Sequence, residues 1–166
     1  MRRVLVVGAN GSGKSTFARE LAKVTGLPLT HLDQVFWQSG WKPSQQVEFD
    51  TKLQALCAES AWILDGNFPR TLEMRASYAD TIIFLDLPFY QCCWQLFKRR
   101  FQYRKRTRPD VAEGCPERFD LRLIQSLCRF LWFDRSRLIE VATMGTNEFH
   151  QLGSTSEKVC FLRNLN

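Results

Sequence analysis

The chain has few of the residues that build metal centres and none of the long apolar runs that cross membranes. Only two histidines accompany its six cysteines, and no two cysteines are spaced as C-x-x-C, so we do not expect a zinc site. No apolar run approaches the length of a membrane span. Only four apolar residues separate Arg3 from Gly8, too few for the core of a signal peptide. We therefore expect a cytoplasmic protein that does not associate with membranes.

Internal repeats, low-complexity segments and nucleic-acid-reading motifs such as the helix-turn-helix are also missing. The 166 residues are enough for one domain with a substantial core and too few for two ordinary domains. A hydrophobic content of 45% and an aromatic content of 13% are typical of a globular protein. We predict a single domain over residues 1–166, either monomeric or homodimeric.

Acidic residues are absent from the stretch Lys98–Arg108, which holds seven of the 23 basic residues. The remaining 16 basic residues nearly balance the 17 acidic ones, so the positive charge is local rather than spread over a surface. Arginines that lead into a loop broken by proline and glycine are typical of a lid that closes over a triphosphate. We predict such a lid at about residues 102–116. Because Phe101 and Tyr103 alternate with the basic residues, a platform for single-stranded nucleic acid and a plain solvated surface are the alternatives.

The most specific motif lies near the N-terminus. Residues 8–15, Gly-Ala-Asn-Gly-Ser-Gly-Lys-Ser, match G-x-x-x-x-G-K-[ST], the phosphate-binding P-loop. Its glycines allow the backbone to wrap and to turn successive N–H groups toward an anion. Lys14 adds a positive charge near the β- and γ-phosphates, and the Ser15 hydroxyl is a ligand for Mg²⁺. The residues predicted to bind a nucleoside triphosphate are Gly8, Asn10, Gly11, Ser12, Gly13, Lys14, Ser15 and Thr16.

The surroundings of this motif have the pattern that a P-loop requires. Val4–Val7 before it is a short apolar run typical of a buried strand, and Phe17, Leu21 and Val24 after it recur at helical spacing. The loop therefore opens a helix, whose N-terminal dipole and free N–H groups favour phosphate.

The rest of the chain alternates short apolar strands with helices. Further strands are predicted at 29–33, 62–65, 81–87 and, weakly, 149–152, with an aromatic loop at 34–43. Helices are predicted after an N-cap at Ser44, at about 90–101, from Pro116 onward, and after 153–156. This alternation predicts an α/β fold with a parallel sheet between helices, and ligands in such folds bind beyond the carboxyl ends of the strands.

Carboxylates stand at or near those predicted strand ends. Asp65 is the best candidate to bind Mg²⁺ through water, and its alternative role is to cap the turn before Gly66. Asp33 is expected to orient waters on Mg²⁺, to accept the proton of an attacking hydroxyl, or to cap the next turn. Trp37 and Trp41 of the aromatic loop are expected either to form the acceptor pocket or to pack in the core.

Several segments together resemble a known group of proteins. Residues 63–71, Ile-Leu-Asp-Gly-Asn-Phe-Pro-Arg-Thr, are similar to the L-D-G-F-P-R-T segment of adenylate kinases, with Asn67 as one extra residue. Nearly the whole chain resembles the adenylate-kinase-related DNA topology modulation proteins of the FlaR type. That resemblance is carried by residues 31–33, 36–37, 40–41, 65–67, 79–86, 98–100, 107–110, 113–117 and 119–120.

The resemblance implies an adenylate-kinase-like P-loop NTPase fold: three αβα layers, five parallel strands and a short arginine-rich lid, with ATP and Mg²⁺ as cofactors. It implies lid or catalytic roles for Arg99, Arg100 and Arg104. It implies that Gly153 and Thr155 belong to the backbone loop that approaches adenine.

The same resemblance implies that Arg70 and Arg75 reach an acceptor phosphate, with Asn67 in the same substrate-binding segment. However, the segment 34–43 has no arginine, so the acceptor need not be a nucleotide. We predict an ATP-dependent phosphotransferase that acts on a small acceptor such as a nucleotide or nucleoside. The alternative is an ATP-binding regulator that acts on DNA topology or nucleic acid through its basic arm.

Overall fold

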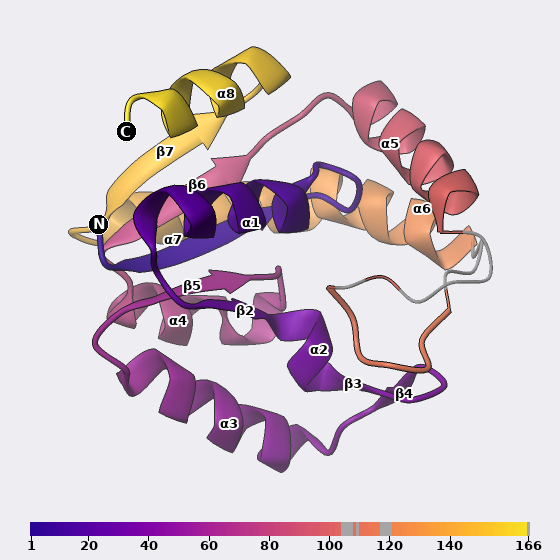
Figure 1. Ribbon diagram of the computed structural model, residues 1–166, viewed down its shortest axis with the longest axis horizontal. Helices are drawn as coiled ribbons and strands as arrows, with labels where there is room; N and C mark the ends of the chain where they lie inside the picture. Colours follow the sequence, from indigo (N-terminus) through magenta and orange to yellow (C-terminus); the bar gives the residue numbers. More distant parts are fainter. Residues whose placement is uncertain (104–107, 109, 117–120, 166) are drawn as a thin grey trace.

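A five-stranded parallel sheet lies at the centre of the computed structural model, which describes residues 1–103, 108, 110–116 and 121–165 (Figure 1). Its spatial order is β2-β5-β1-β6-β7, and every neighbouring pair is parallel. The strands are β1 (Arg3–Gly8), β2 (Leu29–His31), β5 (Trp62–Asp65), β6 (Thr81–Leu85) and β7 (Glu148–Leu152). The predicted α/β fold with five parallel strands is confirmed.

Strand β1 lies in the middle of the sheet, where Val4 pairs with Ile63 on one side and with Thr81 on the other. The chain leaves β1 toward β2 and later returns past β1 to reach β6. The connections therefore change direction beside β1, and ligands of open α/β sheets bind at such a point. The P-loop, which follows β1, lies there.

Helices cover both faces of the sheet and surround its carboxyl edge. α1 (Lys14–Thr25) packs with α8 (Thr155–Arg163) on one face, and α4 (Leu72–Tyr78) packs with α7 (Arg135–Met144) on the other (Figure 1). The remaining elements are α2 (Leu32–Phe36), β3 (Trp37–Gln38), β4 (Lys42–Pro43), α3 (Gln46–Ala58), a 3₁₀ turn η1 (Pro69–Thr71), α5 (Phe89–Gln102), α6 (Leu121–Arg129) and a π-helical turn η2 (Phe130–Asp134). No helix among these described segments is long and apolar enough to cross a membrane.

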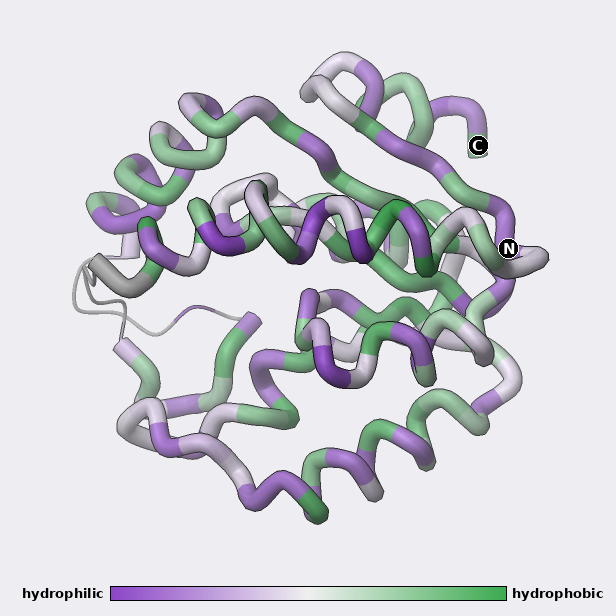
Figure 2. Tube along the Cα trace, turned by 180° about the vertical axis from the view of Figure 1, so that it is seen from behind, coloured by the Kyte–Doolittle hydropathy of each residue, from purple (hydrophilic) through white to green (hydrophobic). Residues whose placement is uncertain are grey.

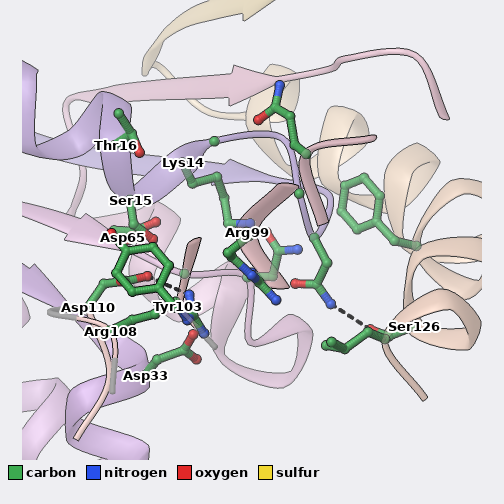
Figure 3. Close-up of a pocket in the computed structure, with 18 of the residues that line it drawn as sticks. Lys14, Ser15, Thr16, Asp33, Asp65, Arg99, Tyr103, Arg108, Asp110 and Ser126 are labelled. Carbon is green, nitrogen blue, oxygen red and sulfur yellow. Dashed lines mark hydrogen bonds and ion pairs between the residues drawn. The ribbon is translucent and has the colours of Figure 1, made fainter. Parts of the chain in front are cut away.

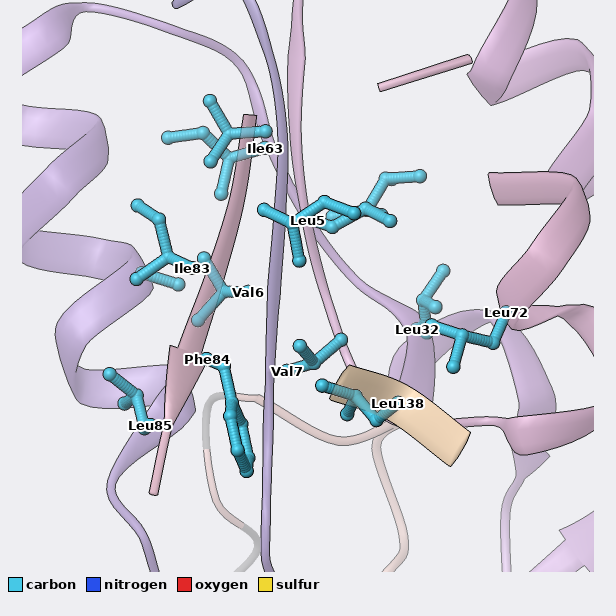
Figure 4. Close-up of a cluster of buried hydrophobic side chains, with 14 of the residues drawn as sticks. Leu5, Val6, Val7, Leu32, Ile63, Leu72, Ile83, Phe84, Leu85 and Leu138 are labelled. Atoms are coloured by element: carbon cyan, nitrogen blue, oxygen red, sulfur yellow. The ribbon is translucent and has the colours of Figure 1, made fainter. Parts of the chain in front are cut away.

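The central strands form the core because helices exclude water from both of their faces. The side chains of 4–7 and 82–85 are at most 1% exposed, and Figure 4 shows Ile83 beside Val6 on one face of the sheet, with Leu5 on the other. The same strands are hydrophobic along their length, whereas the outer helices alternate hydrophobic and hydrophilic residues (Figure 2). Burying each such large apolar side chain contributes about 2 kcal/mol. The core thus fixes the strand ends that carry the candidate site.

The segment after β2 differs from the prediction. The strand ends at His31, so Asp33 lies in the first turn of α2 and not at a strand end. The predicted loop at 34–43 contains an antiparallel hairpin of β3 and β4, turned by Trp41 with a φ of 62°. The ring of Phe36 packs against Phe49 of α3 at a centroid distance of 5.2 Å. This packing joins residues that are distant in sequence, so no local sequence pattern predicts it.

Two other predictions about helix starts were wrong, and two short elements were not predicted. Ser44 does not cap α3, because Gln45 holds the cap position and the Ser44 hydroxyl has no hydrogen-bond partner among the described residues. Pro116 lies outside the described helices, of which α6 begins at Leu121. Helix α4 and the turn η1 were not predicted, because residues 69–78 are too few to show a clear helical period.

Candidate active site

The P-loop curves between β1 and α1 and packs against α5. Gly8, Gly11 and Gly13 have φ values of 150°, 82° and 85°, a backbone region that favours glycine. A side chain at Gly11 would meet the carbonyl oxygen of Cys92 and would lie 2.9 Å from Cγ of Leu96. Backbone conformation and the close approach of α5 both require glycine at this position.

Side chains from distant elements hold the loop in shape. Asn67, after β5, accepts a hydrogen bond from the Gly8 N–H through Oδ1 at 2.9 Å. Lys158 of α8 donates from Nζ to the carbonyl of Ser12 at 3.3 Å. Asn67 therefore stabilises the P-loop. Its predicted role in substrate binding did not include this contact.

Lys14 presents a partly buried cation inside the loop. Its Nζ donates to the carbonyl of Ala9 at 2.9 Å. Burial lowers the pKa of Lys14 below its usual value, although the charges of Asp65 and Asp33 oppose that shift. A bound phosphate would compensate the desolvated ammonium, which is the role the motif predicts.

Asp65 ends β5 beneath the P-loop and is only 4% exposed. Its Oδ2 lies 2.7 Å from Nδ1 of His31, which ends the neighbouring strand β2. Its Oδ1 is buried and has no hydrogen-bond partner among the described residues. One oxygen of this carboxylate is thus bound to His31, and the other can accept a hydrogen bond from a metal-bound water.

Asp33 reaches the same cavity from α2. Burial, together with the charge of Asp65, raises the pKa of Asp33 above its usual value. A carboxylate with a raised pKa is a stronger base, so this position suits a group that accepts the proton of an attacking hydroxyl.

Asp110, which the sequence did not mark as a site residue, comes from the segment after α5 and contacts the P-loop. Its Oδ2 lies 2.7 Å from Nη1 of Arg108 (Figure 3), and its Oδ1 lies 3.9 Å from Nη1 of Arg19. Burial alone would raise the pKa of Asp110, but the Arg108 charge and a hydrogen bond with the Ser15 side chain hold it below the usual value. Only the proximity of Arg108 and Asp110 in sequence hinted at this pair.

The residues present fit a magnesium ion that enters with the nucleotide. No three His, Cys, Asp or Glu side chains converge as a metal centre in the described part of the chain. Mg²⁺ in nucleotide enzymes usually takes one or two carboxylates, waters and substrate phosphates instead of a full protein cage. The Ser15 hydroxyl and the unpartnered Oδ1 of Asp65 offer that smaller set.

A cavity of about 1230 Å³ joins these groups. It extends from the P-loop to the β3–β4 hairpin and is bounded by α5 and α6. The P-loop residues that line it are Asn10, Gly11, Gly13, Lys14, Ser15 and Thr16. Single ligands typically occupy 300–1,000 Å³, so the cavity has room for a nucleotide and a second small molecule.

Trp37 and Trp41 line this cavity and also pack against each other, edge to face, with ring centroids 5.6 Å apart. Trp41 donates from Nε1 to the carbonyl of Pro116 at 3.0 Å. The two uses that the sequence left open, a pocket wall and ordinary packing, are combined here.

The predicted lid arginines have different positions. Arg99 of α5 lines the cavity and extends toward Lys14, whose pKa its charge helps to lower (Figure 3). Arg100 lies on the same helix but does not line the cavity. Arg104 falls outside the described residues.

Arg70 and Arg75 are not brought to the cavity. Arg70 turns outward and pairs with Asp50, with Nη1 and Oδ2 3.0 Å apart. Arg75 is fully buried and donates to the carbonyls of Gly66, Asn67 and Phe68. Burial lowers the pKa of Arg75 to about 10. The structure gives both arginines structural partners in place of the predicted acceptor phosphate.

Gly153 and Thr155 lie where α8 begins and do not line the cavity. The Gly153 N–H donates to Oε2 of Glu157 at 2.7 Å, and Ser154 caps the helix by accepting from the Glu157 N–H at 3.1 Å. Their predicted contact with adenine stays a prediction.

No protein-family model and no curated protein sequence matches this chain. Its fold matches a shikimate kinase from Acinetobacter baumannii in complex with shikimate, at 15% identity and a TM-score of 0.64, over 99% of this chain and 90% of that one. It also matches the shikimate kinase from Bacteroides thetaiotaomicron, at 16% identity and a TM-score of 0.53, over 99% and 96% of the two chains. A third match is the shikimate kinase from Aquifex aeolicus, at 17% identity and a TM-score of 0.50, over 98% and 92% of the two chains.

These comparisons define the class of fold, a three-layer α/β P-loop fold. More narrowly, the arrangement is similar to that of shikimate kinases. At 15–17% identity the likeness establishes the fold alone. The resemblance to DNA topology modulation proteins of the FlaR type stays a prediction.

Proposed function

We propose that the protein is an ATP-dependent phosphotransferase, which moves the γ-phosphoryl group of Mg·ATP to a hydroxyl of a small acceptor. The observation that carries this proposal is one cavity with the P-loop at one end and the carboxylates of Asp33 and Asp65 beside it. Phosphoryl transfer needs such a phosphate cradle, a metal site and a group that orients the attacking hydroxyl. The similarity of the fold to shikimate kinases supports the same class of reaction.

In this proposal each residue of the cavity has a defined task. The P-loop backbone and Lys14 bind the triphosphate, and Ser15 with Asp65 holds Mg²⁺, which neutralises charge on the phosphates. Asp33 orients the acceptor hydroxyl and accepts its proton. Arg99, beside Lys14, stabilises the charge that develops on the transferring group.

The experiment that tests the proposal measures ADP release from Mg·ATP in the presence of nucleosides, nucleotides, sugars and other hydroxylated metabolites. We expect stimulation by an acceptor in the wild-type protein and none in Lys14→Met. Tight ATP binding without stimulation by any acceptor would contradict the proposal. Stimulation that persists in Lys14→Met would also contradict it, because the activity would not arise at the P-loop.

A second candidate function, nucleic-acid binding by the basic arm, is favoured by the exposed aromatic face of α5. Trp94, Phe97 and Phe101 are 65%, 51% and 63% exposed and contact one another in sequence order. Exposed rings next to basic residues can stack on unpaired bases. Binding of a fluorescent single-stranded oligonucleotide that weakens steeply with salt, and that Phe97→Ala reduces, would support this function. Equal binding by wild type and Phe97→Ala would count against it.

A further inference from the structure

One wall of the cavity consists of Asp33, Trp37, Gly40, Trp41, Asp65, Gly66, Asn67, Phe68 and Pro69. We call these residues the acceptor wall: Asp65 and Asn67 adjoin the P-loop, and the others extend the cavity from there to the β3–β4 hairpin. It is built by α2, the β3–β4 hairpin and the loop after β5. No residue of this wall carries a positive charge, and all of them belong to the described part of the chain.

The arginines nearest to the wall in sequence have other partners. Arg70 pairs with Asp50 outside the cavity. Arg75 is enclosed below the wall, where its guanidinium binds backbone carbonyls of the wall itself. Arg75 cannot bind an anionic acceptor without breaking its contacts with the loop after β5, and Arg70 does not line the cavity.

The charged groups of the cavity differ from one side to the other: Lys14, Lys98 and Arg99 come from the P-loop and α5, whereas three carboxylates lie in or beside the wall. Asp33 and Asp65 belong to the wall, and Asp110 stands beside it. Arg19 and Arg108, which also line the cavity, are paired with Asp110 at 3.9 Å and 2.7 Å. A phosphate or carboxylate placed here would be repelled by the carboxylates, whereas hydroxyl groups would donate hydrogen bonds to them.

The remaining wall surface is aromatic. Trp37 and Trp41 are half-buried and line the cavity together with Phe68. The indole N–H of Trp41 is already bound to Pro116. Rings of this kind bind the flat or apolar faces of sugar rings and nucleobases, with no need for charge on the ligand.

We infer that the acceptor is an uncharged ring compound with a free hydroxyl, that is, a sugar or a nucleoside without phosphate or carboxylate groups. This inference rests on the proposed phosphotransferase function. It requires that the hydroxyl oxygen attacks the γ-phosphorus of ATP, that the bond from this phosphorus to the β,γ-bridging oxygen breaks, and that the hydroxyl proton leaves with Asp33 or with water.

The test compares neutral acceptors with anionic counterparts that keep the same ring: adenosine with AMP, thymidine with its 5′-monophosphate, ribose with ribose 5-phosphate, and glucose with glucuronate. Full-length protein is assayed for kcat/KM with saturating Mg·ATP. We expect the neutral member of at least one pair to be favoured by tenfold or more. Comparing the nucleoside pairs with the sugar pairs then shows whether the acceptor is a nucleoside or a sugar.

Preference for the charged member would overturn the inference while leaving the phosphotransferase proposal intact. If Mg·ATP binds and no compound of either charge is phosphorylated, both are overturned. As a second measurement, Trp37→Leu should raise the KM of the neutral acceptor about tenfold without changing the KM of ATP. The control is Trp132→Leu, a tryptophan 77% exposed outside the cavity. An unchanged acceptor KM in Trp37→Leu would contradict the role of the aromatic wall.

Discussion

At the scale of single residues, Asp33 combines a functional advantage with a cost in stability. Its pKa is raised by burial and by Asp65, so the folded protein favours the protonated carboxyl. The stability that this group contributes is complete below the ordinary pKa of aspartate, about 4, and is lost as the pH rises through the higher pKa of the folded state. Ionising Asp33 in the folded protein therefore costs free energy at the position where the proposed reaction needs a base.

Replacing that charge tests both statements. We expect Asp33→Asn to have a higher melting temperature than the wild type at pH 7, with a difference that shrinks as the pH falls toward 4. We also expect it to lose acceptor-dependent turnover by a factor on the order of 100 or more. A variant that is destabilised at pH 7, or that keeps full turnover, would contradict this description of Asp33.

Arg75 and Arg70 are residues of the same type that we expect to differ in their contribution to stability. Arg75→Met leaves three buried or partly buried carbonyls without their donor, so we expect a loss of about 3 kcal/mol in the free energy of unfolding. Arg70→Ala removes an ion pair whose arginine is 52% exposed, and we expect a change within about 1 kcal/mol. Urea denaturation of both variants measures these differences. Equal effects of the two substitutions would show that Arg75 is not the structural clamp described here.

At the scale of elements, the β3–β4 hairpin and the segment 110–116 form one unit over the cavity. The Gly40 N–H donates to the carbonyl of Gly114 at 2.9 Å, and Cys115 Sγ donates to the carbonyl of Gln38 at 3.2 Å. Gly114 has a φ of 78°, and a side chain there would meet Oγ of Ser39. The hairpin that carries the aromatic wall is thus positioned by the segment that carries Asp110.

This coupling predicts the effect of adding one methyl group. We expect Gly114→Ala to raise the acceptor KM severalfold, because the new side chain displaces the hairpin. The matched control is Gly26→Ala: Gly26 has a similar φ of 70°, but no atom lies within 4 Å of the added carbon. Both variants carry the same backbone strain, so only the clash differs. Equal acceptor KM values in the two variants would contradict the coupling.

The elements that could be predicted are those with local signals. The strands are continuous apolar runs, the P-loop is a contiguous motif, and α1 and α5 have long helical periods. The hairpin and α4 were missed because their residues are few and are ordered by contacts such as those of Phe36 and Arg75. In the site, Lys14, Ser15 and Asp65 follow from motif and strand ends. The places of Asp110 and His31 in the site could not be predicted, because their partners Ser15 and Asp65 are remote in sequence.

At the scale of the whole molecule, the sheet brings the ends of separate strands to one edge, and that edge holds the cavity. The order β2-β5-β1-β6-β7 places the P-loop, which follows β1, next to Asp65, which ends β5. The donor site and the acceptor site that we propose would then share one cavity, which lies between the helices α5 and α6 and the hairpin. This arrangement suits transfer between two bound molecules better than hydrolysis of one.

The most direct test of phosphoryl transfer follows the γ-phosphate itself. The full chain is incubated with Mg²⁺, ATP labelled with ³²P at the γ-position, and an acceptor that stimulates ADP release, and the products are separated. We predict that the label appears in the acceptor, in amounts equal to the ADP formed, and that Lys14→Met abolishes this transfer. Label found only in inorganic phosphate, or only in unreacted ATP, would contradict the assignment of this protein as a phosphotransferase.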